Sequence, residues 1–229
     1  MDLGIAGKKA LVVGSTKETG AAVVRSLREA GADVYGLARK DAEIVADLME
    51  STDVVEQITS KAGHPDIIVH VTGNSMGIKN SLATSAEWAK VWKLNLGVAI
   101  DINRAFLPAM LSKGWGRIVH FSSNGVKLAI GNAPYTSAKS AVEGYVRTVS
   151  KEVSARGVVI TGVSPGPIKT EGRFLYSQDD SWTQLYWDKY VPIKRWGRGS
   201  EVGALVAFLC SAHSSYMAGA IVEVDGGMR

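Results

Sequence analysis

Cysteine is almost missing from this chain: Cys210 is the only one among 229 residues. A single cysteine excludes an intrachain disulfide and favours a reducing compartment, so a cytoplasmic protein is expected. No apolar run is long enough to span a membrane, and the start Met1-Asp2 lacks the basic and apolar regions of a signal peptide. The sequence therefore predicts neither a membrane protein nor a disulfide-stapled secreted one.

Metal ligands and clustered basic residues are also scarce. The four histidines show no metal-ligand spacing, which argues against a metal site. The formal charge is +4, but lysines and arginines are scattered, so no nucleic-acid interface is expected. The spare positive charge suits a phosphorylated ligand better. With 46% hydrophobic and 21% charged residues, the composition is that of an ordinary soluble globule.

Strand-like and helix-like segments alternate along the chain, which predicts one α/β domain over 1–229 with a parallel sheet covered on both faces. We expect strands at 9–13, 33–37, 43–47, 66–71, 117–121, 158–163 and 220–224, and helices at 21–30, 51–62, 84–113, 135–156 and 200–211. About five residues join the second and third strands, too few for a usual crossover helix, so this edge should be thinly covered. Pro108 should kink or break the helix that contains it.

A tyrosine and a lysine one helical turn apart are the first candidates for chemistry. If the residues from Pro134 onward form a helix, Tyr135 and Lys139 share one face. A neighbouring ammonium favours a phenolate over a phenol, so this pair suits proton transfer to an alcohol or carbonyl oxygen. The alternative is a buried aromatic beside a solvated cation. Tyr190 and Lys194 have the same spacing, but the proline between them should break any helix.

A glycine-containing loop joins the first expected strand to the first expected helix. Such a loop aims backbone N–H groups and the helix dipole at an anion. Gly14 and Gly20 are the only glycines in it, so the alternative is a tight turn that binds no ligand.

Taken together, these pieces resemble the classical short-chain dehydrogenase/reductase family over nearly the whole chain. The matching residues are the 14–20 loop, Asp47, Gly73, Asn95, Ser122, Tyr135, Lys139, Pro165, Gly166, Thr170, Asp225, Gly226 and Gly227. The resemblance implies a single-domain, Rossmann-type, doubly wound parallel sheet of about seven strands. It also implies hydride transfer between a nicotinamide dinucleotide and a small carbonyl or alcohol substrate, in a homotetramer.

The resemblance gives each candidate catalytic residue a role. Tyr135 would protonate the carbonyl oxygen, and Lys139 would lower the pKa of the phenol and hold the nicotinamide ribose. Ser122 would donate a hydrogen bond to the substrate oxygen where charge develops, with Ser123 as the alternative. Asn95 would kink its helix and hold a water in the proton relay.

The end of the second strand distinguishes NADP(H) from NAD(H). NAD enzymes place an acid there to bind the 2′-hydroxyl, whereas this chain has Ala38-Arg39-Lys40, with Lys17 nearby in the loop. Arginine suits a 2′-phosphate, so NADP(H) is expected, although Asp41 would favour NAD(H). The expected cofactor-binding residues are Gly14, Ser15, Thr16, Lys17, Thr19, Arg39, Asp47, Leu48, Thr72, Gly73, Tyr135, Lys139, Pro165, Gly166, Ile168 and Thr170.

Two departures from the family pattern keep a rival interpretation open. Glu18 stands where the family has its middle glycine and should hinder the approach of a pyrophosphate. Residues 70–73 read His-Val-Thr-Gly instead of Asn-Asn-Ala-Gly, which loses two amides that brace the sheet. The rival is a cofactor-binding sensor or scaffold that does not turn over. A second rival, an enoyl reductase, fits the Tyr–Lys spacing and Ser122 less well.

The segment 171–196 falls where the family has its substrate lid. Its aromatic residues suit a pocket for a ring or an apolar chain, or else pack the lid and the subunit contacts. Its basic residues, which suit an anion, are Arg173, Lys189, Lys194 and Arg195. The sequence does not name the substrate. The long helices near Ser85 and Pro134 are the expected subunit contacts.

Overall fold

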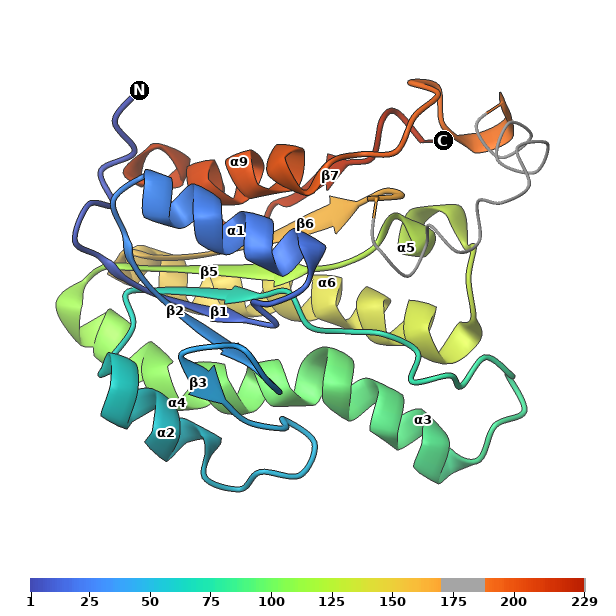
Figure 1. Cartoon of the computed structure of the whole chain (residues 1–229), viewed down its shortest axis with the longest axis horizontal. Coiled ribbons are helices and arrows are strands. Elements are labelled where there is room, and N and C mark those ends of the chain that lie inside the picture. Colours follow the sequence, from blue (N-terminus) through green and yellow to red (C-terminus); the bar gives the residue numbers. More distant parts are fainter. Residues whose placement is uncertain (170–187, 229) are drawn as a thin grey trace.

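The computed structural model describes residues 1–169 and 188–228. In these residues seven strands form one all-parallel sheet in the order β3-β2-β1-β4-β5-β6-β7 (Figure 1). The strands are β1 (Lys9–Val13), β2 (Asp33–Ala38), β3 (Ile44–Val45), β4 (Ile67–His70), β5 (Gly116–Phe121), β6 (Val158–Pro165) and β7 (Ile221–Val224). The strand order reverses between β1 and β4, and a parallel sheet binds its ligand at the carboxyl ends beside such a reversal.

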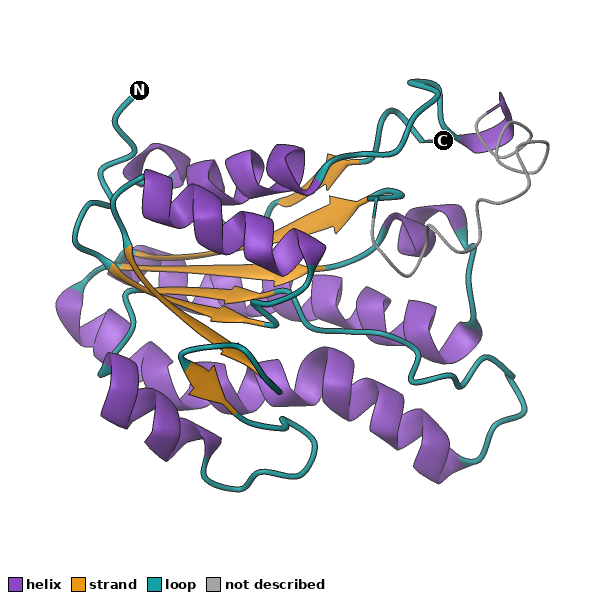
Figure 2. Ribbon diagram, viewed as in Figure 1, coloured by secondary structure: helices purple, strands orange, loops and turns teal. Residues whose placement is uncertain are grey.

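Helices cover both faces of this sheet (Figure 2). They are α1 (Glu18–Glu29), α2 (Val54–Ala62), α3 (Ser85–Trp92), the π-helix η1 (Lys93–Gly97), α4 (Val98–Lys113), α5 (Asn124–Leu128), α6 (Ala133–Val153), the 3-10 turn η2 (Ser154–Arg156), α9 (Gly199–Leu209) and the 3-10 turn η3 (Ala212–Ser214). Helices α1 and α9 share one apolar cluster with the sheet, and α2, α4 and α6 share the other. In the described part of the chain, no helix has the length and apolar character needed to cross a membrane.

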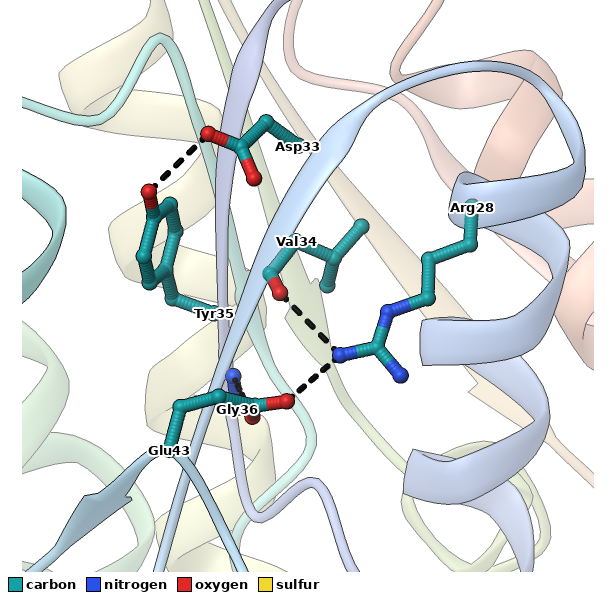
Figure 3. A network of polar contacts seen from close by, with 6 residues as sticks. All are labelled: Arg28, Asp33, Val34, Tyr35, Gly36 and Glu43. Carbon is teal, nitrogen blue, oxygen red and sulfur yellow. Dashed lines mark hydrogen bonds and ion pairs between the residues drawn. The ribbon is translucent and has the colours of Figure 1, made fainter.

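The short strand β3 leaves part of the β2 edge without a backbone partner, because it pairs only with the last two residues of β2. Asp33 N donates to Lys8 O, just before β1, so the backbone N–H and C=O groups of Val34 and Gly36 point away from β1. An ion pair covers them (Figure 3): Arg28 Nη2 donates to Val34 O at 3.2 Å and to Glu43 Oε1 at 2.6 Å, and Glu43 Oε2 accepts from Gly36 N at 2.8 Å. Two side chains thus replace the missing strand length at an exposed edge.

The predicted α/β fold is confirmed, and each expected strand and helix lies within a few residues of its predicted place. The thin cover at the β2–β3 edge is also found, since residues 39–43 join the two strands without a helix. The prediction that Pro108 would break its helix was wrong, because α4 continues through this residue. The interruption lies at η1, where Asn95 Nδ2 donates to Val91 O and competes for a helical acceptor. Helix α5 was not predicted.

Candidate active site

The carboxyl ends of β4, β5 and β6 open into a cleft of about 760 Å³. Its walls come from segments that are far apart in sequence: the start of α1, the loops after the three strands, and the start of α6. Eight of the predicted site residues line it, namely Thr19, Gly73, Ser122, Tyr135, Lys139, Pro165, Gly166 and Ile168. The parallel sheet therefore gathers most of the predicted catalytic group into one cavity.

Tyr135 and Lys139 occupy successive turns of α6 at this cleft. Asn132 caps the helix by accepting from Tyr135 N at 3.1 Å, and Pro134 lies in the first turn, where its missing N–H is not needed. The Lys139 ammonium lies 5.8 Å from the centre of the Tyr135 ring. The pair predicted from spacing alone is thus brought together by an ordinary capped helix. By contrast, Lys194 lies in a turn with φ +55°, so the second Tyr–Lys pair shares no helix.

Lys139 is buried rather than solvated, with 2% of its surface exposed. Its ammonium donates to Phe121 O at 2.7 Å and to Thr72 O at 3.3 Å. Burial lowers the pKa of this lysine from 10.5 to about 7, because desolvation penalises the charged form. A buried cation with a depressed pKa at a cleft wall is typical of a functional site.

Asn95 lies behind Lys139 in the π-helical turn. Its Nδ2 donates to Asn74 O and Val91 O, both at 2.8 Å, and its Oδ1 is buried without a hydrogen-bond partner among the described residues. Gly73 makes room for this arrangement: a Cβ there would lie 2.3 Å from Asn95 Oδ1 and 2.6 Å from Lys139 Nζ. The backbone of Gly73, with φ +143°, also favours glycine.

The two adjacent serines after β5 point to different partners. Ser122 is buried and donates its hydroxyl proton to Glu143 Oε1 at 2.7 Å, and Glu143 in turn pairs with Arg147 at 2.9 Å. Ser123 caps α5 by accepting from Gly125 N at 3.2 Å, which uses a lone pair and not its proton. Both serines line the cleft. No local pattern in the sequence points to Glu143 as a partner, because this residue lies 21 positions later, on α6.

The loop between β1 and α1 has the tight geometry of a phosphate-binding turn. Gly14 has φ +88°, and a Cβ on Gly20 would lie 2.0 Å from Gly14 O, so no larger residue fits at the second position. Ser15 Oγ is buried without a partner among the described residues. These features fit a bound pyrophosphate. Glu18 lies in the first turn of α1, at the end of the helix that attracts anions.

A second cleft of about 660 Å³ continues from this loop along α1. Its cations are Lys17, Arg25, Arg28 and Lys40, and its acids are Glu29, Asp41 and Glu43. Of the residues predicted to bind the cofactor, Ser15, Thr16 and Lys17 line it. Arg39 is exposed and does not line this cleft, so Lys40 rather than Arg39 shares the cleft with Lys17.

The remaining predicted residues lie close to these clefts or outside the described part of the chain. Thr72 packs beside Gly14, where a Cβ would lie 3.2 Å from Thr72 N. Asp47 and Leu48 follow β3, and Asp47 accepts from Met49 N at 2.9 Å. Thr170 and most of the expected lid, 170–187, lie outside the described residues. No cluster of three metal-ligating side chains occurs within 1–169 and 188–228.

Comparisons with known proteins agree with this geometry. A family model described as "Enoyl-(Acyl carrier protein) reductase" matches residues 10–229. A 3-oxoacyl-(acyl-carrier-protein) reductase of Vibrio cholerae is 30% identical over 244 residues, with 99% of each chain covered. L-sorbose reductase of Gluconobacter frateurii, solved in complex with NADPH and L-sorbose, superposes with a TM-score of 0.91 at 27% identity, covering 100% of this chain and 98% of that one.

A further solved structure is a 3-oxoacyl-(acyl-carrier-protein) reductase of Agrobacterium tumefaciens with NADP bound. It has a TM-score of 0.91 at 26% identity and covers 99% of this chain and 96% of that one. The chain belongs to the short-chain dehydrogenase/reductase family. Its class is therefore that of the nicotinamide-dependent oxidoreductases.

Proposed function

We propose that this protein transfers a hydride between NADP(H) and a carbonyl or alcohol substrate. The observation that carries the proposal is the buried Lys139 ammonium, 5.8 Å from the Tyr135 ring at the wall of a cleft. When bound, the cofactor supplies the hydride, and this chain's residues hold it and move the proton. The loop residues Thr16, Lys17 and Thr19, which line the two clefts, would receive its pyrophosphate.

In this proposal Tyr135 is the proton donor to the carbonyl oxygen during reduction. The Lys139 ammonium beside it stabilises the phenolate that remains after the transfer, so the phenol becomes a better acid. Asn95 would hold a water behind Lys139 through its buried Oδ1, which accepts no hydrogen bond from the described residues. The water would resupply the proton from the side of the helix away from the substrate.

We assign the hydrogen bond to the substrate oxygen to Ser123 rather than Ser122. A serine hydroxyl has one proton, and that of Ser122 is already donated to Glu143. Replacing a donor of this kind lowers kcat by about 100-fold or more. Ser123→Ala is therefore expected to show that loss and Ser122→Ala to retain most of the turnover. The opposite result would restore Ser122 as the donor.

The preference for NADP(H) rests on the cations beside the β1–α1 loop. Lys17 and Lys40 line the cleft that would receive a 2′-phosphate, with Arg39 next in sequence. NADPH is expected to protect the protein against thermal unfolding more strongly than NADH at equal concentration. Equal or stronger protection by NADH would overturn this part of the proposal.

The direct test follows NADPH oxidation with three substrate classes: simple ketones, a 3-oxoacyl thioester and an enoyl thioester. Turnover of a carbonyl compound, with the matching alcohol as product, supports the proposal. Turnover of the enoyl thioester alone would favour an enoyl reductase, the activity in the name of the matching family model. Binding of NADPH without any turnover would favour a sensor or scaffold, the function that the acidic Glu18 would suit.

The subunits are proposed to form a homotetramer through the long helices. Trp92 on α3 and Ile100 on α4 are 40% and 37% exposed, and large apolar side chains at such positions favour a contact with another subunit. Sedimentation analysis at several concentrations tests this. A tetramer that dissociates when Trp92 and Ile100 are replaced by Ser supports it, and a monomeric wild type contradicts it.

A further inference from the structure

Two histidines lie side by side at the carboxyl ends of the central strands. His70 on β4 and His120 on β5 are register partners, and their rings stack with centroids 4.7 Å apart at an interplanar angle of 25°. They are 3% and 1% exposed. Two buried imidazoles in contact need hydrogen-bond partners or they cost stability.

Asn103 on α4 supplies partners to both histidines with one amide group. Its Oδ1 lies 2.9 Å from His70 Nε2, and its Nδ2 lies 3.1 Å from His120 Nε2. The same Nδ2 donates to the Tyr145 hydroxyl on α6 at 3.1 Å, and the Tyr145 ring meets His120 edge-on at 5.4 Å. Four side chains from two strands and two helices therefore form one buried polar network.

The amide fixes opposite proton positions on the two rings. An amide oxygen only accepts and an amide nitrogen only donates, so one histidine must donate through Nε2 and the other must accept there. Exchanging the amide's oxygen and nitrogen exchanges the two roles but keeps them opposite. In the arrangement described, His70 carries its proton on Nε2 and His120 on Nδ1.

This network lies directly behind the carbonyls that hold Lys139. Phe121 O, the nearer acceptor of the ammonium, belongs to the residue after His120, and Thr72 O lies two residues after His70. Phe121 is the last residue of β5, and Thr72 lies just beyond the end of β4, so imidazoles held in place at these strand ends would also hold the two acceptors in place. The pKa of His70 is lowered to about 4 and that of His120 well below its usual value, mainly by burial; the charge of Lys139 contributes to both shifts and His70 contributes to that of His120.

We propose that His70, His120, Asn103 and Tyr145 form a positioning network that holds the Phe121 and Thr72 carbonyls against the Lys139 ammonium. The two histidines do so as neutral, opposite tautomers. The role in turnover rests on the proposed function, but the network and its effect on Lys139 do not. The short-chain dehydrogenase/reductase family has two asparagines at positions 70 and 71, where this chain has histidine and valine. The network would take the place of those two amides.

The first test is structural and needs no activity. Long-range proton–nitrogen NMR of the imidazoles, assigned with His70→Gln and His120→Gln, is expected to show one ring protonated at Nε2 and the other at Nδ1 from pH 6 to 8. The same tautomer on both rings, or a charged ring in that range, would overturn the network.

The second test measures the pKa of Lys139 by NMR in variants. Asn103→Leu removes all three contacts, and we expect the Lys139 pKa to fall further because the ammonium loses well-placed acceptors. The ionisable groups around Lys139 are His70, His120 and, on its own helix, Tyr135 and Glu143, so their titrations are followed together. An unchanged Lys139 pKa in Asn103→Leu overturns the positioning role.

Kinetics then separate positioning from simple destabilisation. Asn103→Leu is expected to lower kcat by about 10- to 100-fold, with the KM for NADPH nearly unchanged. The pH profile of alcohol oxidation is expected to move to higher pH. His70→Gln, whose amide reaches as far as Nε2, should restore a donor where His70→Leu does not. Ile102→Val on the same helix removes a buried methyl and should leave the pH profile in place. An unshifted profile in Asn103→Leu contradicts the inference; an inactive wild type contradicts the proposed function instead.

Discussion

Lys139 should destabilise the protein at neutral pH, and its removal should show this cost. In the folded chain its pKa falls from 10.5 to about 7, because burial penalises the ammonium. Below pH 7 both the folded and the unfolded chain carry the proton, so the full cost is present. As the pH rises from about 7 to 10.5, the folded chain loses its proton first and the cost shrinks. Above 10.5 the cost is absent.

The size of this effect follows from the same two values. At 1.36 kcal/mol per pH unit, an interval of about 3.5 units corresponds to about 5 kcal/mol at low pH. Lys139→Met removes that cost but leaves Phe121 O and Thr72 O without their donor, which costs about 2 kcal/mol. The variant is therefore expected to be about 3 kcal/mol more stable than the wild type at pH 6. Near pH 10.5 it is expected to be about 2 kcal/mol less stable.

Urea unfolding of the ligand-free protein at intervals from pH 6 to 10.5 measures this crossover. Lys127→Met is the matched control, because that lysine is 50% exposed and forms a surface ion pair with Glu223, which contributes little to stability. The control should follow the wild type at every pH. A stability difference between Lys139→Met and the wild type that stays constant across the range would refute the reasoning.

Three other substitutions have expected outcomes of their own. Glu18→Gln removes a negative charge from the first turn of α1, the end of the helix that attracts anions. The loss of charge repulsion should tighten NADPH binding about two- to fivefold in a binding titration. Weaker binding by the variant would contradict this repulsion. Glu43→Gln breaks the ion pair with Arg28 at the β2 edge and should lower the free energy of unfolding by about 1 kcal/mol. An unchanged free energy of unfolding would show that the ion pair does not stabilise this edge. Gly73→Ala places a Cβ 2.6 Å from the Lys139 ammonium. The displaced ammonium should lower kcat by about 100-fold, while the variant still binds NADPH. Turnover at the wild-type rate would show that Lys139 can move aside without loss of activity.

The fold was readable from the sequence because its signals are local. Alternating apolar segments and glycine turns each follow from neighbouring residues, and the parallel sheet that they predict is found. The helix expected from residue 84 onward begins with a capping box between Thr84 and Glu87, which is also a local signal. Pro108 is a residue for which local helix propensity gave the wrong prediction. Proline destabilises an isolated helix, but α4 also gains stability because Phe106 and Met110 pack in the core cluster beside the sheet.

The site was readable only in part, because some of its contacts depend on register. Tyr135 and Lys139 follow from helical spacing, but the contact of His70 with His120 requires the parallel pairing of β4 with β5. A search for metal-ligand spacing could not find two histidines 50 residues apart, nor the Asn103 amide that joins them. The family resemblance favoured Ser122 over Ser123, and only the fold shows that Glu143 lies beside Ser122 and accepts its proton.

Turnover by the Tyr135→Phe variant tests the central claim most directly. The substitution keeps the ring that lies near Lys139 and removes only the proposed proton. We expect the wild type to consume NADPH with a carbonyl substrate, and the variant to bind NADPH equally well while its kcat falls by about 100-fold or more. Equal turnover by both proteins would contradict the account.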